Sequence, residues 1–212
     1  GVIPIKDLGN PDGPEVQPLN IGVVQEAGKR SQSAYFYNGG VRDVRRVKTS
    51  YGYHLAGTDN HRIKVLSKEG KIEWRYMADV QTGDVACINR GSNLWSDRYV
   101  NLKGYHNSKE LPDILGVGWG LLLGYLAGEF FLSKDTISVT SCRYATPQLS
   151  DLFQNLFGSK DSYAHGVSYT NPSVVEFLSK IGVDCSVPKN ARQVPSVILR
   201  SPKKVVASYL RG

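Results

Sequence analysis

Cysteine is scarce in this chain. Its 212 residues include three cysteines, Cys87, Cys142 and Cys185, and no two of them form a CxxC pair. An odd number of widely spaced cysteines argues against a disulfide framework and against a zinc site. No secretory signal is visible at the N-terminus either. We therefore expect a protein of the reducing, cytoplasmic (intracellular) compartment.

Methionine is scarcer still. Met77 is the one methionine, and the sequence starts at Gly1. The last five residues, SYLRG, stop in the middle of a segment with a helical pattern. These two features lead us to expect an internal fragment of a longer polypeptide.

The excess of charge of one sign is modest. The net charge is +7, while 41% of the residues are hydrophobic and 21% are charged, which is ordinary for a globular protein. A positive balance of this size mildly favours a polyanionic partner such as nucleic acid. A chain of this length can form one large domain or two modest ones.

Helical patterns are missing from the first 95 residues. Short stretches rich in Val, Ile, Tyr and Thr alternate there with glycine-containing turns, which is typical of β-strands. From residue 114 onward the pattern changes to helix (114–132), strand (135–144), helix (146–158), strand (162–170) and further helices. We predict an α+β protein with an all-β domain over residues 1–95 and an α/β domain over residues 96–212.

The run from residue 114 to 132 is almost wholly apolar and is long enough to suggest a membrane span. It contains five glycines, one acid near its end and no flanking basic cluster, so we expect no membrane contact. An ordinary buried core helix explains the apolarity but not Gly124 and Gly128, which lie four apart on one helix face. Small residues at this spacing allow a second helix to pack closely.

Glu129 follows these glycines directly. A carboxylate at the C-terminal end of a helix meets the unfavourable end of the helix dipole. A divalent cation would compensate it, and Mg²⁺ prefers oxygen ligands of this kind.

The stretch LLGYLAGEFF, residues 122–131, resembles the first motif of the LAGLIDADG homing endonucleases, which cut double-stranded DNA. In that family two such helices pack together, and the acid at each end binds Mg²⁺ beside a scissile phosphate. The resemblance makes Glu129 the metal ligand and catalytic acid, with Gly124 and Gly128 in the helix pair. Two departures bear on cleavage: Phe130 replaces the usual glycine, and glutamate replaces the commoner aspartate.

Two downstream segments extend this resemblance. DTISVTSCRY, residues 135–144, resembles a strand of the family's DNA-contacting αββα-type saddle; ordinary solvent-exposed strand residues are the alternative. ARQVPSVILRSPKKVVASYLRG, residues 191–212, resembles the approach to the second motif, with SYLRG as its start. Arg192 stands three before Pro195, where the family usually has lysine. The candidate DNA-contacting residues are Thr136, Ser138, Thr140, Arg143 and Arg192.

In the first domain, the segment GTDNHRIKVL places Thr58 and His61 three apart. Alone, this spacing is also what a turn threonine and a surface histidine produce. Together with GVIPIKDLG, the strands of residues 35–66 and WRYMADVQTGDVACI, it resembles the Hint domain of inteins, a horseshoe-shaped β fold with a TxxH motif. A Hint-like front before a LAGLIDADG-like back is typical of a large intein.

An intein catalyses autocatalytic protein splicing, an acyl transfer that needs no cofactor. The resemblance implies that His61 protonates the leaving amide nitrogen and that Thr58 orients the scissile peptide or its oxyanion. The N-terminal nucleophile and the C-terminal His-Asn pair are not in this sequence. We therefore expect segments at both ends and a host protein (extein) as partners, with little activity from this fragment alone.

Two alternatives remain open from the sequence. One is a split-intein piece that works after binding partner fragments. The other is a degenerate, non-cutting remnant whose second half only holds the fold or binds DNA, which Glu129 and Phe130 favour. The sequence identifies neither the interrupted host protein nor the DNA target.

Overall fold

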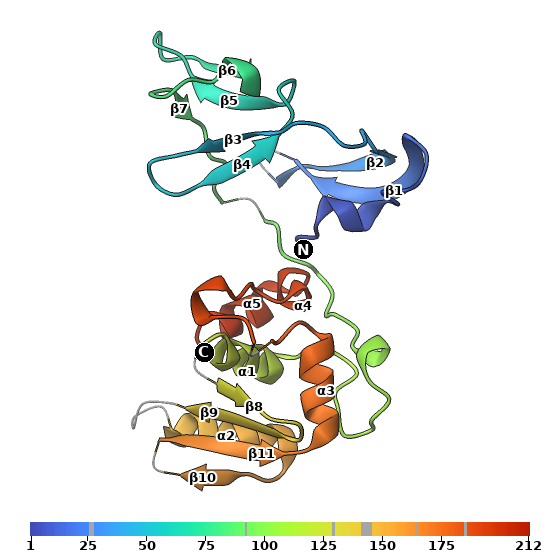
Figure 1. Cartoon of the computed structure of the whole chain (residues 1–212), viewed down its shortest axis with the longest axis vertical. Helices are drawn as coiled ribbons and strands as arrows, with labels where there is room; N and C mark the ends of the chain where they lie inside the picture. The colour runs from blue at the N-terminus through green and yellow to red at the C-terminus, as the bar shows by residue number, and fades with distance from the viewer. Residues whose placement is uncertain (26–27, 92, 129, 141–145, 164, 185) are drawn as a thin grey trace. The chain divides into compact units, whose positions relative to one another are not determined.

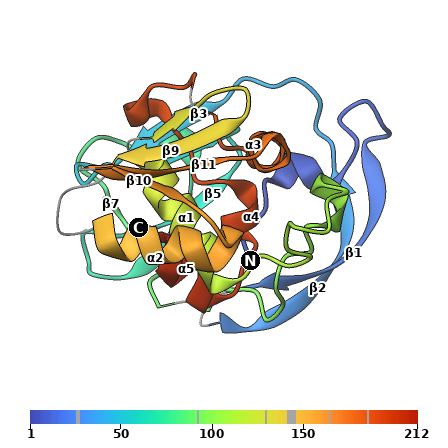
Figure 2. The same ribbon diagram turned by 90° about the horizontal axis from the view of Figure 1, so that it is seen from below.

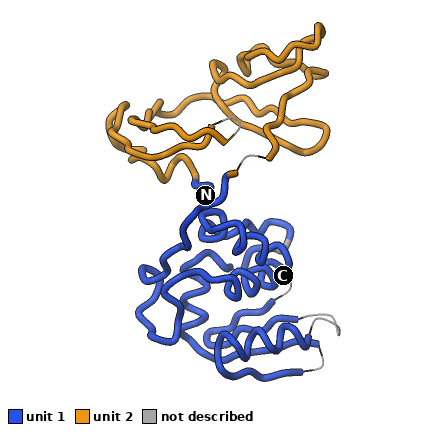
Figure 3. The backbone as a smooth tube through the Cα atoms, turned by 180° about the vertical axis from the view of Figure 1, so that it is seen from behind, with its two compact units in different colours: residues 1–3, 94–212 blue, residues 4–93 orange. Residues whose placement is uncertain are grey.

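The computed structural model describes residues 1–212 except 26–27, 92, 129, 141–145, 164 and 185. The chain forms two compact units, shown in different colours in Figure 3. The strand-rich unit spans Pro4–Asn93, and the helical unit comprises Gly1–Ile3 and Leu94–Gly212. The predicted boundary, between residues 95 and 96, lies two residues after the observed one, and the first three residues group with the helical unit rather than the strand-rich one.

The strand-rich unit is built from antiparallel hairpins. β1 pairs with β2, β3 with β4, and β5 lies between β6 and β7. Gly52 and Gly70 lie in the turns of the second and third hairpins with φ of 84° and 76°, a conformation that glycine adopts without steric cost. The strands are β1 (Val16–Val24), β2 (Arg30–Tyr37), β3 (Arg45–Lys48), β4 (His54–Gly57), β5 (Arg62–Leu66), β6 (Ile72–Tyr76) and β7 (Val85–Ala86).

This unit buries little apolar surface. Among its described residues, Val65 and Met77 are the buried hydrophobic side chains, and both are fully covered. Large side chains such as Tyr35 and Trp74 remain 68% and 62% exposed. It also contains two short 3₁₀ turns, η1 (Ile5–Leu8) and η3 (Met77–Asp79).

The helical unit contains one antiparallel sheet with the strand order β10-β11-β9-β8. Figure 1 shows how α1 and α5 lie together beside this sheet. Its elements are η4 (Lys103–Tyr105), α1 (Val117–Ala127), β8 (Phe130–Leu132), β9 (Thr136–Thr140), α2 (Thr146–Phe157), β10 (Asp161–Tyr163), β11 (Gly166–Thr170), α3 (Pro172–Lys180), η5 (Lys189–Ala191), α4 (Ser196–Leu199) and α5 (Lys203–Tyr209).

Two predicted elements differ from the structure. The helix predicted through residue 132 ends at Ala127, Gly128 caps it, and Phe130–Leu132 pair with β9 as β8. Consecutive phenylalanines after a glycine favour an extended strand over a continued helix. The strand predicted over residues 162–170 is a hairpin, because Tyr163 pairs back onto Gly166.

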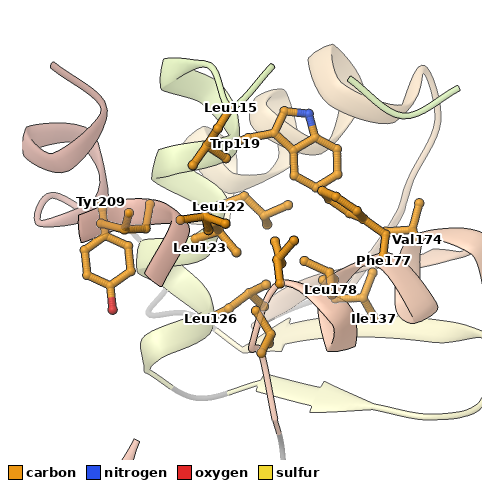
Figure 4. Close-up of a cluster of buried hydrophobic side chains, with 14 of the residues drawn as sticks. Leu115, Trp119, Leu122, Leu123, Leu126, Ile137, Val174, Phe177, Leu178 and Tyr209 are labelled. Carbon is orange, nitrogen blue, oxygen red and sulfur yellow. The ribbon is translucent and has the colours of Figure 1, made fainter. Parts of the chain in front are cut away.

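The apolar core of the helical unit lies between its helices and one face of the sheet. Ile137 of β9 and Phe177 of α3 are covered by leucines of α1, as Figure 4 shows. The indole of Trp119 contacts the Phe177 ring edge-on, with the ring centres 5.3 Å apart. Helix α2 packs against β11 on this same face of the sheet (Figures 1 and 2). No helix in the described ranges is both long and apolar enough to span a bilayer.

Candidate functional site

The backbones of α1 and α5 touch at two glycines. A Cβ added to Gly124 would overlap the carbonyl oxygen of Tyr209, and one added to Gly120 would lie 2.9 Å from the carbonyl oxygen of Val205. Neither position therefore has room for a side chain. Helices come this close only where small residues line the contact.

The contact is reciprocal. A Cβ added to Gly212 would overlap the carbonyl oxygen of Leu121, just as Gly124 meets Tyr209. The hydroxyl of Ser208 donates to the carbonyl of Val117 at 2.9 Å, which mirrors Gly120 against Val205.

In each mirrored contact, corresponding residues of the two helices are 88 positions apart. The corresponding pairs are Val117 with Val205, Gly120 with Ser208, Leu121 with Tyr209, and Gly124 with Gly212. The two helices thus present the same pattern of small residues to each other, which is the signature of a local two-fold relation.

Gly128 lies one turn beyond the last described contact of this crossing. It is the C-terminal cap of α1, and its N–H donates to the carbonyl oxygen of Tyr125 at 3.1 Å. In the described part of the chain, a Cβ added at Gly128 would come close to that same oxygen, 3.3 Å away, and to no atom of α5. Within this sequence the described contacts with α5 are made by Gly124 and by Gly120, one turn earlier, and the packing role of Gly128 stays a prediction.

Sequence reasoning missed Gly120, Ser208 and Gly212. The signal was present, because Gly120-xxx-Gly124 and Ser208-xxx-Gly212 repeat the same small-residue spacing. It was obscured by two further glycines, Gly116 and Gly128, which continue this spacing in both directions.

Arg192 lies against the end of α1. Its Nη1 donates to the carbonyl oxygen of Gly128, and its Nε donates to the carbonyl oxygen of Val187 at 3.2 Å. Its guanidinium carbon lies 4.5 Å from the centre of the Phe130 ring. A cation at this end of a helix is electrostatically favourable.

Glu129 itself lies outside the described residues, so its side chain has no described geometry. The part of the chain that is described holds no group of three or more His, Cys, Asp or Glu side chains arranged for a metal ion. One carboxylate after a helix suits Mg²⁺ when further oxygens come from a second acid or a phosphate. The residues present therefore fit one half of a metal site.

A cavity of about 550 Å³ opens beside the end of α1. Ala127 and Phe130 line it together with Lys180, Asp184 and Arg192. The pKa of the Asp184 carboxyl is lowered, chiefly by hydrogen bonds from Ser186 and to a smaller extent by the positive charge of Arg192. The end of α1 thus borders a space with charged side chains.

The predicted DNA-facing strand residues lie on the sheet face away from the helices. Burial alternates along β9: Ile137 and Val139 are buried, while Thr136 and Ser138 are partly exposed and Thr140 is exposed. Cross-strand partners in β11 add Ser168 and Thr170 to this side, and the hydroxyls of Thr136 and Thr170 are 3.0 Å apart. We call Thr136, Ser138, Thr140, Ser168 and Thr170 the hydroxyl face.

The hydroxyl face carries no basic residue of its own, since the four strands contain neither lysine nor arginine. Arg143, the predicted basic contact next to it, lies outside the described residues. Lys134, which is exposed, stands in the turn between β8 and β9. Phosphate-neutralising charge at this face would therefore come from loops and not from the strands.

In the strand-rich unit, Thr58 and His61 form the two ends of a tight turn after β4. The N–H of His61 donates to the carbonyl of Thr58 at 2.9 Å, and the Thr58 hydroxyl donates to Asn60 Oδ1 at 2.6 Å. His61 is exposed and Thr58 is partly buried. To stabilise an oxyanion, Thr58 would have to donate its hydroxyl hydrogen to it. In this structure the hydroxyl donates to Asn60 Oδ1 instead.

This turn is held from both sides. Asp59 accepts from Arg45 Nε at 3.0 Å, and its carbonyl accepts the N–H of Ala78 at 3.1 Å. The carbonyl of His61 accepts the N–H of Met77 at 2.7 Å. Sequence reasoning missed Asp59 and its partner Arg45.

No model of a known protein family matches this chain. A stretch of the chain is similar to the A subunit of DNA gyrase from Mycobacterium leprae (strain TN), with 26% identity over 76 residues. The match covers 34% of this chain and 6% of the relative. The matched stretch therefore spans only a small part of that relative's length.

Proposed function

We propose that this chain belongs to an intein. The strand-rich unit supplies the TxxH-bearing part of a Hint protein-splicing domain, and the helical unit supplies the first half of a LAGLIDADG homing endonuclease. The enzyme activities are self-splicing acyl transfer and site-specific cleavage of double-stranded DNA for intein homing.

The observation that carries this proposal is the reciprocal crossing of α1 and α5. Two helices related in this way bring equivalent ends together, as a paired catalytic site requires. Glu129 stands five positions after Gly124. The same relation predicts an acidic residue five positions after Gly212 in the polypeptide that the gene encodes.

In this proposal the DNA lies along the hydroxyl face, where serine and threonine hydroxyls contact phosphates and base edges. Bound Mg²⁺ supplies Lewis-acid stabilisation of the phosphate oxygens and activates the attacking water. Glu129, which follows the first helix in sequence, would hold the metal. The apolar face of the same sheet fixes β9 on the helices, so that the hydroxyl face is presented on a rigid support.

For splicing, His61 is the proton donor to the amide nitrogen that leaves in the first acyl shift. Its turn is anchored by the ion pair of Asp59 with Arg45 and by the Met77 hydrogen bond. Thr58 orients the scissile peptide once its hydroxyl exchanges Asn60 for the substrate oxygen. No cofactor takes part in this chemistry.

The similarity to a gyrase polypeptide is compatible with this proposal. It joins a third of this chain to a short stretch within a much longer polypeptide, as is expected when a segment is embedded in a host protein. A degenerate remnant that binds DNA without cutting is the second candidate, and Phe130 in place of the family's glycine favours it.

Cleavage of DNA by the full gene product tests the nuclease part. The substrate is the uninterrupted host gene in Mg²⁺, and the variants are Glu129→Gln and, as a control, Glu176→Gln, whose carboxylate pairs with Lys180 on the surface of α3. We expect Glu129→Gln to slow cleavage at least about a hundredfold, because several kcal/mol of charge stabilisation depend on the metal.

The control variant should cleave normally. Equal cleavage by Glu129→Gln and the unmodified protein would remove Glu129 from the mechanism. DNA binding with no cleavage by any version would instead favour the non-cutting remnant.

A further inference from the structure

Arg192 contacts the residue before Glu129 and the residue after it. Through its Nη1 it holds the carbonyl of Gly128, the residue before Glu129, and its guanidinium covers the ring of Phe130, the residue after it. The third contact, from Nε to the carbonyl of Val187 at 3.2 Å, ties the same side chain to the loop before η5.

We propose that Arg192 is a positioning residue that fixes the backbone on both sides of Glu129. This inference rests on the proposed nuclease function and deepens it, since it assigns Arg192 a role that is not a contact with DNA. The segment before α4, which is distant from α1 in sequence, thereby holds the residues before and after Glu129.

Three physical effects support this role. Helix α1 has no basic residue in its last turn, so Arg192 supplies the missing cation at the negative end of the helix dipole. Its hydrogen bond satisfies a carbonyl at the helix end that has no partner within the helix. Its stacking on Phe130 orients the first residue of β8.

Arginine and lysine cannot make the same set of contacts at this position. A planar guanidinium donates in two directions from different nitrogens while its face covers an aromatic ring, and an ammonium group cannot do all three. A residue that merely neutralises a phosphate is replaceable by lysine, whereas this set of contacts is not. Lysine substitution therefore distinguishes positioning from phosphate contact.

The test is a Mn²⁺ titration of the full gene product followed by NMR, in which bound Mn²⁺ broadens the amide signals near Glu129. The variants are Arg192→Lys and Arg192→Met. Arg200→Met serves as the matched control, because Arg200 contacts Tyr105 and Ser196 instead. Glu129→Gln identifies the broadening that depends on the carboxylate.

We expect both Arg192 variants to need about ten to a hundred times more Mn²⁺ for the same broadening, the effect typical of residues that orient a metal ligand. Arg200→Met should behave as the unmodified full gene product. In the full gene product, DNA affinity measured in Ca²⁺ should change less than twofold in Arg192→Lys. A preserved amide spectrum of Arg192→Lys shows that the variant is folded.

The outcomes separate this inference from the proposed function. Normal Mn²⁺ broadening in Arg192→Lys, with weakened DNA binding in Arg192→Met, would make Arg192 a phosphate contact and overturn the positioning role alone. Broadening that is absent from the unmodified full gene product, or unchanged there by Glu129→Gln, would remove the metal site and both proposals with it.

Discussion

His61 is the residue whose substitution tests the splicing part of the proposal. Its imidazole is exposed, while its backbone is fixed by hydrogen bonds to Thr58 and Met77. In the full gene product, His61→Ala should slow the first acyl shift about 10²- to 10⁴-fold, the usual contribution of a positioned proton donor. Thiol- or hydroxylamine-induced cleavage at the N-terminal splice junction measures this step.

The control for this experiment is another exposed histidine of the same unit. His54 lies on β4 opposite Lys48, so His54→Ala should leave the acyl shift unchanged. Equal rates for His61→Ala and the unmodified protein would contradict the assignment of the proton donor.

For single residues, the sequence showed which side chains of a strand face the core but not which glycines of α1 contact the second helix. The alternation of Ile137 and Val139 with polar neighbours was readable because a strand has a period of two. The contact of Gly120 with the second helix was not readable, because Gly116, Gly120, Gly124 and Gly128 repeat every four residues. Only the position of the second helix decides which of them lie in the crossing.

At the scale of elements, the crossing of α1 and α5 makes a sharp prediction about stability. Gly124→Ala forces the two backbones apart, because the new methyl group overlaps the Tyr209 carbonyl. We expect it to lower the free energy of unfolding by about 1–3 kcal/mol, the usual cost of overpacking. Urea denaturation followed by circular dichroism measures the change.

Gly118→Ala is the matched control on the same helix. Its methyl group would meet only the flexible ends of the Leu156 and Leu152 side chains, at 3.2 Å and 3.9 Å. Alanine favours a helix over glycine by about 0.8–1 kcal/mol, so this variant should be as stable as the unmodified chain or more so. A Gly124→Ala variant as stable as Gly118→Ala would show that the helices do not meet as described.

Element types were more predictable than element ends. The helix of residues 146–158 corresponds to α2, whose buried residues Leu149, Leu152 and Phe153 lie on one face. The long apolar run did not reveal where α1 ends, because apolar residues continue from Leu121 to Leu132 on both sides of the single acid Glu129. The end is set by tertiary contacts, namely the pairing of Phe130–Leu132 with β9 and the Arg192 hydrogen bond to Gly128.

At the scale of the whole molecule, burial is divided unequally between the units. The helical unit holds a continuous core around Phe153 and Phe177, whereas the described strand-rich unit buries Val65 and Met77. Two-stranded hairpins are marginally stable on their own. Hydrogen exchange of the 212-residue chain should therefore be fast in β1 to β4 and slow in α1, β9 and β11, because local opening free energy follows buried apolar contact.

If the proposed function is right, this difference in hydrogen exchange between the two units should shrink in the full gene product. In the full gene product, the remainder of the splicing domain should cover exposed side chains such as Tyr35, Tyr37 and Trp74, and the β1–β4 amides should become at least about a hundredfold more protected. Exchange in α1 should change much less, since most of its large apolar side chains are already buried within the chain. Mass spectrometry of both proteins measures the two regions in one experiment. Strong protection of β1–β4 already in the 212-residue chain would mean that this unit is stable without further apolar cover, and the argument that it is part of a larger splicing domain would lose its physical basis.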